Sequence, residues 1–180
     1  MTPFPLLDEL PDVELQTTRL DGESYRLADA YLPIGIRPEP AVRATAALVG
    51  RSPRLIAALG TAAWIWGAAR QAPARGEYLV DLAARWRPAP SRTIDITESV
   101  LHPDDVIRWG RAAVTTPLRT VIDLARFRPS FEERDARAVR ELARIGSFDA
   151  AAAVAALSRS RNLSHKHLAA ERIRAAFSPS

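Results

Sequence analysis

Three histidines and a pair of adjacent aspartates are the side chains of this sequence best suited to acid–base or metal chemistry. His165 and His167 are two residues apart on a predicted helix, so their rings point to different sides and cannot share one metal ion. His102 precedes Asp104 and Asp105 in a predicted loop, where paired acids most often cap the next helical turn instead of acting in catalysis. We therefore expect neither a catalytic site nor a metal site.

The motifs by which enzymes activate nucleophiles or hold phosphate groups are missing. The sequence contains no cysteine, which excludes disulfides and thiolate metal sites. It has no Gly-x-Ser-x-Gly elbow, no Gly-x-x-x-x-Gly-Lys loop and no Gly-x-Gly-x-x-Gly fingerprint. The sequence thus predicts a protein that is not an enzyme and that needs no cofactor.

Trp86 stands between Arg85 and Arg87 in a predicted loop, and this combination suits a binding site. The indole ring could stack on a nucleic-acid base or contact a protein partner. A purely structural arrangement, in which the ring is half-buried and the two arginines extend from it to solvent, accounts for this sequence equally well. The sequence leaves both interpretations open.

A second group of arginines follows one broad face of a helix predicted over residues 131–145. Arg134, Arg137, Arg140 and Arg144 recur at helical spacing behind a cluster of acids, an order that matches the helix macrodipole. This face could meet DNA, RNA or an acidic protein surface. The alternative is a solvated amphipathic helix whose charges only match its dipole.

The run from Val114 to Arg126 combines local signals that all predict a strand leading into a capped helix. Thr116 can accept hydrogen bonds from the free N-terminal amides, and Pro117 takes the first helical position. Arg119 and Asp123 are one turn apart, and we expect Arg119 to be partly buried against Asp123. The predicted structural motif consists of Thr116, Pro117, Arg119, Thr120 and Asp123.

The hydrophobic pattern of the chain predicts an α+β fold, with a small sheet, flanking helices and a helical C-terminal third. The 180 residues, 47% of them hydrophobic, suffice for one core. Strands are predicted over residues 77–82, 93–97 and 112–115, and helices over 41–49, 131–145, 148–157 and 163–177. The apolar run 55–69 is shorter than the ~18 residues that a membrane span needs, so we expect a buried helix there and no membrane contact.

The N-terminal region carries a strong signal for a β-hairpin. Residues 13–18 and 24–27 flank Asp21-Gly22, a dipeptide typical of two-residue hairpin turns. We therefore predict a short hairpin appendage over residues 1–35, ahead of a domain over residues 36–180.

Three stretches resemble, in the same order, the antitoxin domain of the AbiEi family, the antitoxin half of type IV toxin–antitoxin modules of abortive infection. The pattern Val-Thr-Thr-Pro-x-Arg-Thr-x-x-Asp-Leu-Ala-Arg at 114–126 is the most specific of them. Residues 55–67 are similar to the family's short strand and following helix, although Ala and Leu stand where the family usually has Ser and His. Residues 94–96 and 101–110 are similar to the strand and the Asp-Val connector that precede the Thr-Pro-x-Arg-Thr segment.

In the AbiEi family this domain follows a winged helix-turn-helix, and residues 25–33 resemble the end of its wing. Too few residues precede Val13 for a complete recognition helix, so we expect the DNA-reading module to be missing or degenerate. The hairpin is then a wing-like remnant. Binding to duplex DNA with sequence preference is accordingly expected to be weak or lacking.

The resemblance implies a non-enzymatic regulatory protein of the bacterial cytoplasm, an antitoxin that antagonises a nucleotidyltransferase-like toxin through weak or indirect contact. A nucleic-acid-binding transcriptional regulator without a cognate toxin is the alternative. Residues 1–50 hold four arginines and eight acids, whereas residues 126–180 hold eleven basic and six acidic residues. This asymmetry suits a nucleic-acid or acidic partner, but it is also what a GC-rich genome produces, and the sequence does not predict an oligomeric state.

Overall fold

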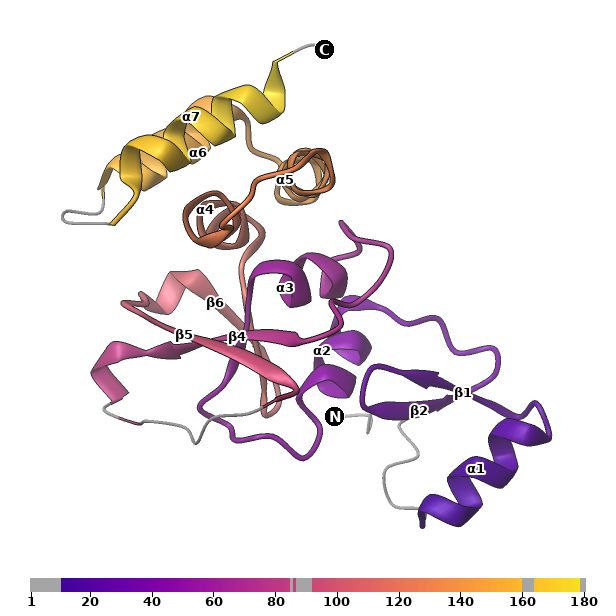
Figure 1. Cartoon of the computed structure of the whole chain (residues 1–180). Helices are drawn as coiled ribbons and strands as arrows, with labels where there is room; N and C mark the ends of the chain where they lie inside the picture. Colours follow the sequence, from indigo (N-terminus) through magenta and orange to yellow (C-terminus); the bar gives the residue numbers. More distant parts are fainter. Residues whose placement is uncertain (1–10, 85, 87–91, 160–163, 179–180) are drawn as a thin grey trace.

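The computed structural model describes residues 11–84, 86, 92–159 and 164–178, and its fold is α+β, as the sequence predicts (Figure 1). The elements are, in chain order and with η for 3₁₀ turns, α1 (Asp12–Leu20), β1 (Ser24–Leu27), β2 (Ala30–Pro33), α2 (Pro40–Leu48), β3 (Ile56–Ala57), α3 (Leu59–Ile65), β4 (Gly76–Asp81), η1 (Leu82–Ala84), β5 (Ile94–Ser99), η2 (Pro103–Asp105), β6 (Val106–Trp109), β7 (Ala112–Thr115), α4 (Pro117–Phe127), α5 (Glu133–Gly146), α6 (Ala150–Arg159) and α7 (Lys166–Phe177).

Five short strands form one mixed sheet in the order β5-β4-β3-β7-β6. β4 and β5 run parallel over their whole length, while the central β3 is antiparallel to β4 and parallel to β7. β6 and β7 form an antiparallel hairpin that turns at Gly110, where the backbone has a φ of 59°. Although β3 has only two residues, both are buried because strands flank it on each side.

The sheet separates two hydrophobic cores. On one face, α2 packs over Tyr78, Val80 and Val114. On the other face, Leu79 belongs to the core formed with α4, α5, α6 and α7. Figure 1 shows these four helices as a layer beyond α3, with α6 and α7 side by side at the outside. The predicted helical C-terminal third is thus confirmed, and it forms a layer on one side of the sheet.

The N-terminal hairpin is present, but the predicted pairing of its strands is wrong. Residues 13–18 lie in the helix α1 and form no strand. The hairpin instead joins β1 to β2, with Leu27 opposite Ala30 and a two-residue turn at Ala28-Asp29. Its Leu32 is fully buried, so the hairpin is anchored to the rest of the protein.

The error has a clear physical cause in the dipeptide Asp21-Gly22, which ends a helix instead of turning a hairpin. Gly22 has a φ of 73° and its amide donates to the carbonyl of Arg19, while the Glu23 amide donates to the carbonyl of Thr18. This is the hydrogen-bond pattern of a Schellman C-cap, which needs the same positive φ as a tight hairpin turn. Local sequence does not distinguish the two uses of Asp-Gly.

The other predicted elements are found close to their expected places. The helices predicted at 41–49, 131–145, 148–157 and 163–177 correspond to α2, α5, α6 and α7, and the three predicted strands correspond to β4, β5 and β7. The strand β6 was not predicted, because its residues Val-Ile-Arg-Trp show no clear alternation. Within the described part of the chain, no helix is long and apolar enough to cross a membrane.

Candidate functional site

The predicted motif begins helix α4 in the way its residue types dictate. The Thr116 hydroxyl accepts a hydrogen bond from the Arg119 amide at 3.3 Å, and Pro117 occupies the first turn. Thr120 turns back toward the strand that leads into the helix, because its hydroxyl lies 2.7 Å from that of Thr115 and donates to the Thr116 carbonyl. These contacts fix the angle at which α4 leaves the sheet.

The Arg119 side chain is buried and binds partners from three separate segments. Its Nε donates to both carboxylate oxygens of Asp123, at 3.0 and 2.9 Å. One terminal nitrogen donates to Asp105 at 2.6 Å and to the Val100 carbonyl at 3.0 Å, and the other donates to the Ser99 hydroxyl at 2.8 Å. The predicted pairing of Arg119 with Asp123 is therefore confirmed, and Asp105 is a partner that the sequence did not reveal.

Asp123 has no exposed surface and lies between two arginines, with Arg119 at 2.9 Å and Arg126 at 3.8 Å. Burial raises the pKa of Asp123 from 3.8 to about 6, although both arginines act in the opposite direction. One terminal nitrogen of Arg126 is buried without a hydrogen-bond partner within the described residues. Attraction between Asp123 and the two arginines thus holds the cluster together, although removing these charged groups from water costs considerable free energy.

This cluster is suited to joining segments and offers little to a substrate. Every hydrogen bond of the Arg119 guanidinium goes to a protein oxygen, of α4, of the end of β5 or of the η2 turn. No described cavity opens onto Arg119 or Asp123. Its geometry is that of a structural joint, which agrees with the role predicted for the motif.

The predicted binding residues around Trp86 are only partly described. Arg85 and Arg87 lie outside the described residues. The Trp86 ring is half-buried against the core beneath α2, and the Arg54 guanidinium lies 6.0 Å from the ring centre. The arginine that contacts this ring in the described structure is thus remote in sequence from the two that suggested a binding site.

The arginines of α5 do not form one free basic face. Arg140 binds Glu133 at 2.6 Å and donates to the Ala176 carbonyl at the end of α7 at 2.8 Å. Arg144 binds Glu141 on its own helix at 2.7 Å. Of Arg137, Arg140 and Arg144, only Arg137 is exposed without an ion pair or hydrogen bond within the described residues. The charges of this face are therefore largely compensated by neighbouring acids.

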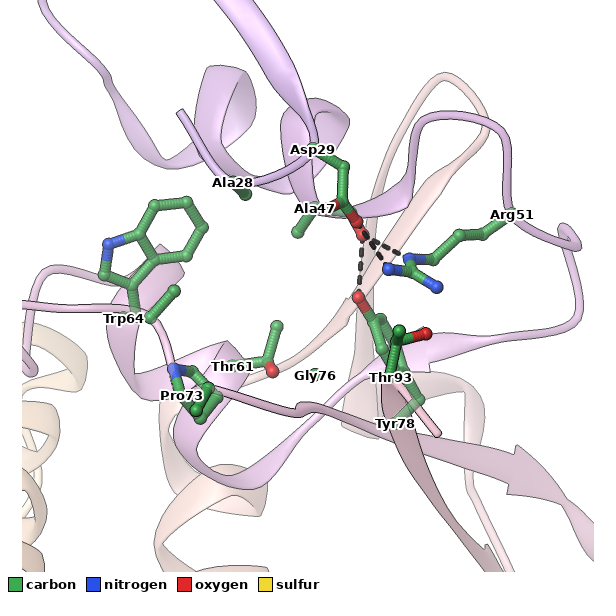
Figure 2. A pocket seen from close by; sticks show the side chains of 12 residues that line it. Ala28, Asp29, Ala47, Arg51, Thr61, Trp64, Pro73, Gly76, Tyr78 and Thr93 are labelled. Carbon is green, nitrogen blue, oxygen red and sulfur yellow. Dashed lines mark hydrogen bonds and ion pairs between the residues drawn. The ribbon is translucent and has the colours of Figure 1, made fainter. Parts of the chain in front are cut away.

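A pocket of about 270 Å³ lies where the N-terminal hairpin meets the body of the protein (Figure 2). Asp29 from the hairpin turn forms an ion pair with Arg51, which follows α2. The Arg51 guanidinium also lies 5.3 Å from the centre of the Tyr78 ring, and the Tyr78 hydroxyl donates to the Ala47 carbonyl at 2.7 Å. Burial raises the pKa of Tyr78, so this phenol stays protonated near neutral pH.

The polar groups of this pocket mainly satisfy one another. Figure 2 shows Asp29 and Arg51 meeting at one side, with Trp64 and Thr61 on the other. Thr61 accepts from the Glu77 amide at 2.8 Å, and the pair of Asp29 and Arg51 fastens the hairpin to α2. No sequence signal could have found this pair, because its members are 22 positions apart and neither belongs to a motif.

Within the described residues, no three His, Cys, Asp or Glu side chains are grouped so that they could hold a metal ion. No protein-family model matches the sequence, and a search among curated proteins finds no significant match. The relationship to the AbiEi family therefore stays a resemblance carried by three short stretches.

Proposed function

We propose that this chain is a non-enzymatic, antitoxin-like regulatory protein that antagonises a nucleotidyltransferase-like toxin in the bacterial cytoplasm. The observation that supports the proposal is that the three stretches that resemble the AbiEi family are bonded directly to one another. The Trp66 indole donates to the Thr115 carbonyl at 2.8 Å, and Ala57 of β3 pairs with Val114 of β7. These two contacts join residues 55–67 to residues 114–126.

The ion pair of Asp105 with Arg119, at 2.6 Å, joins residues 101–110 to residues 114–126. Asp105 is the acid of the Asp-Val connector, and Arg119 is the arginine of the Thr-Pro-x-Arg-Thr segment. The residues that carry the resemblance therefore lie in contact with one another, and a regulatory protein that is not an enzyme acts through a surface.

Co-expression tests the proposal directly. A nucleotidyltransferase-like toxin encoded beside this chain should arrest growth when expressed alone, and expression of this chain should restore growth. No rescue at matched expression levels, with the chain recovered folded, would contradict the antitoxin assignment. That result would favour the alternative, a nucleic-acid-binding regulator without a cognate toxin.

The helical layer offers a first surface to test within the same assay. Arg137→Glu with Arg144→Glu reverses two exposed charges and leaves the bond from Arg140 to α7 in place. Weakened rescue by this folded variant would support α5 as the contact surface. Full rescue would exclude α5 and move the search to the sheet side of the molecule.

A further inference from the structure

An open groove of about 640 Å³ lies on the sheet, and its lining shares no residue with that of the pocket beside the hairpin. The strand register places Ile56 of β3 and Arg108 of β6 on the same face, with β7 between them. Asp81 at the end of β4, His102 ahead of η2 and Pro103 at its start complete the rim. This groove belongs neither to the Arg119 joint nor to the arginine face of α5.

Two arginines of the groove have no carboxylate partner. Arg54 and Arg108 are both exposed, and neither guanidinium makes an ion pair or hydrogen bond within the described part of the chain. The Trp86 ring lies 6.0 Å from the Arg54 guanidinium, a cation–π contact that favours one position of the arginine while leaving its donors free. The groove thus presents two available guanidinium forks, which suit the oxygens of phosphate groups.

The surface between these arginines is apolar. Ile56, Leu101, Pro103 and Val106 line the groove and offer aliphatic carbon in place of hydrogen-bonding groups. An acidic peptide would satisfy the arginines but would leave this surface without a matching partner. A nucleotide brings both an anion and a flat ring, and bases bind well on apolar and aromatic surfaces next to arginine.

We propose that this groove binds single-stranded nucleic acid, with phosphate groups at Arg54 and Arg108 and a base against the apolar surface. A duplex would not fit this arrangement, since its bases are stacked inside and only its backbone could reach the groove. Asp81 also lines the groove and accepts from the Ala83 amide at 3.0 Å, so its carboxylate repels a nearby phosphate. This activity goes beyond antagonism of a toxin and does not require one.

Fluorescence anisotropy with labelled oligothymidylate and oligouridylate of about 12 nucleotides tests the proposal, and the two probes distinguish DNA from RNA. The double variant Arg54→Ala with Arg108→Ala should bind at least about 10-fold more weakly, because two charge-assisted contacts are lost. Its plot of log affinity against log salt should be shallower by about 1.4, or about 0.7 for each phosphate contact removed.

Two matched variants make the test specific. Arg19→Ala with Arg174→Ala removes the same charge from exposed positions on α1 and α7 and should bind like the parent protein. Asp81→Asn removes the opposing carboxylate while its amide oxygen can still accept from Ala83, and it should bind more tightly. Circular dichroism should show the same fold for all of these proteins.

Several results would overturn the proposal. These are unchanged binding by the groove variant, equal loss by the α1 and α7 variant, or no binding of either oligonucleotide by the parent protein. Polyglutamate of equal charge serves as the competitor. If it binds the parent protein as tightly as the oligonucleotides do, the groove selects an acidic peptide and the nucleic-acid assignment fails.

Discussion

Arginine–carboxylate pairs occur in two regions of this protein, and their surroundings give them different roles. In the joint at the start of α4, Arg119 is almost fully buried and binds Asp123 and Asp105 together with a hydroxyl and a carbonyl. On α5, Arg144 is exposed and binds Glu141, whose side chain is partly exposed. Both regions contain an arginine and an acid at helical spacing, so sequence alone gives them similar weight.

The two regions differ in how well water solvates the charged side chain that remains after its partner is removed. Water solvates either member of an exposed pair as soon as the other is removed, so the pair adds little. In a buried cluster, water does not reach the remaining charge, so removal of its partner lowers the free energy of unfolding. Burial therefore makes the α4 joint the more sensitive region, and the predictions below test that contrast from the largest effect to the smallest.

The largest effect is expected for Arg119→Ala. This change leaves Asp123 and Asp105 without their main cation, and breaking a buried pair costs about 3–5 kcal/mol of unfolding free energy. Urea denaturation measures the loss, with Arg144→Ala as the matched control. If both variants lose the same small amount, the α4 cluster does not behave as a buried one.

The next effect is a pH dependence that belongs to Asp123. Its pKa is raised to about 6 in the folded protein, against 3.8 for the unfolded chain, so the folded state takes up the proton first as the pH falls. This group therefore contributes stability below pH 4 that is lost as the pH rises through 6. Relative to Asp123→Asn, the parent protein should gain about 2 kcal/mol of unfolding free energy between pH 7 and pH 4.

Denaturation curves of both proteins across this pH range give the difference, in which the other carboxyl groups cancel to first order. If the Asn variant does not fold, carbon NMR of the Asp123 carboxyl in the parent protein reports its titration directly. A midpoint at or below the ordinary value for aspartate would show that the two arginines outweigh burial.

The helix cap gives a smaller effect. Thr116→Ala removes the hydroxyl that accepts from the Arg119 amide and should lower the unfolding free energy by about 1 kcal/mol. Thr116→Ser keeps the acceptor and should recover most of that loss. Equal destabilisation by both changes would indicate that the methyl group, and not the cap, stabilises this turn.

The sequence predicted the α4 helix well because its signals are local. Thr116, Pro117 and the spacing of Arg119 to Asp123 all lie within one or two turns, where residue type and position determine the contact. Asp105 and Ser99 were not identified as partners, since their contacts with Arg119 depend on how the sheet brings separate segments together. Local signals specify a helix but not the residues that its buried face meets.

The same limit explains what was missed elsewhere. Asp21-Gly22 carries a signal that serves a helix end and a hairpin turn alike, and the choice depended on the packing of α1 against β1. The partners of Arg140 came from a helix start and from the end of α7, which no spacing rule connects. The groove of Arg54 and Arg108 likewise brings together the turn before β3 and the strand β6, which are distant in sequence.

The smallest effects separate two neighbouring arginines of α5. Arg140→Ala removes the bond to the Ala176 carbonyl and should lower the unfolding free energy by about 0.5–1 kcal/mol, near the lower end for a hydrogen bond because the side chain is partly exposed. Arg144→Ala should leave the denaturation midpoint within error of the parent protein, since Arg144 is exposed and water reaches Glu141 as well. Hydrogen exchange sharpens the comparison, because only Arg140→Ala should speed exchange of the amides at the end of α7. Equal behaviour of the two variants would mean that the bond between α5 and α7 adds nothing to the helical layer, and that both arginines are free to serve as surface contacts.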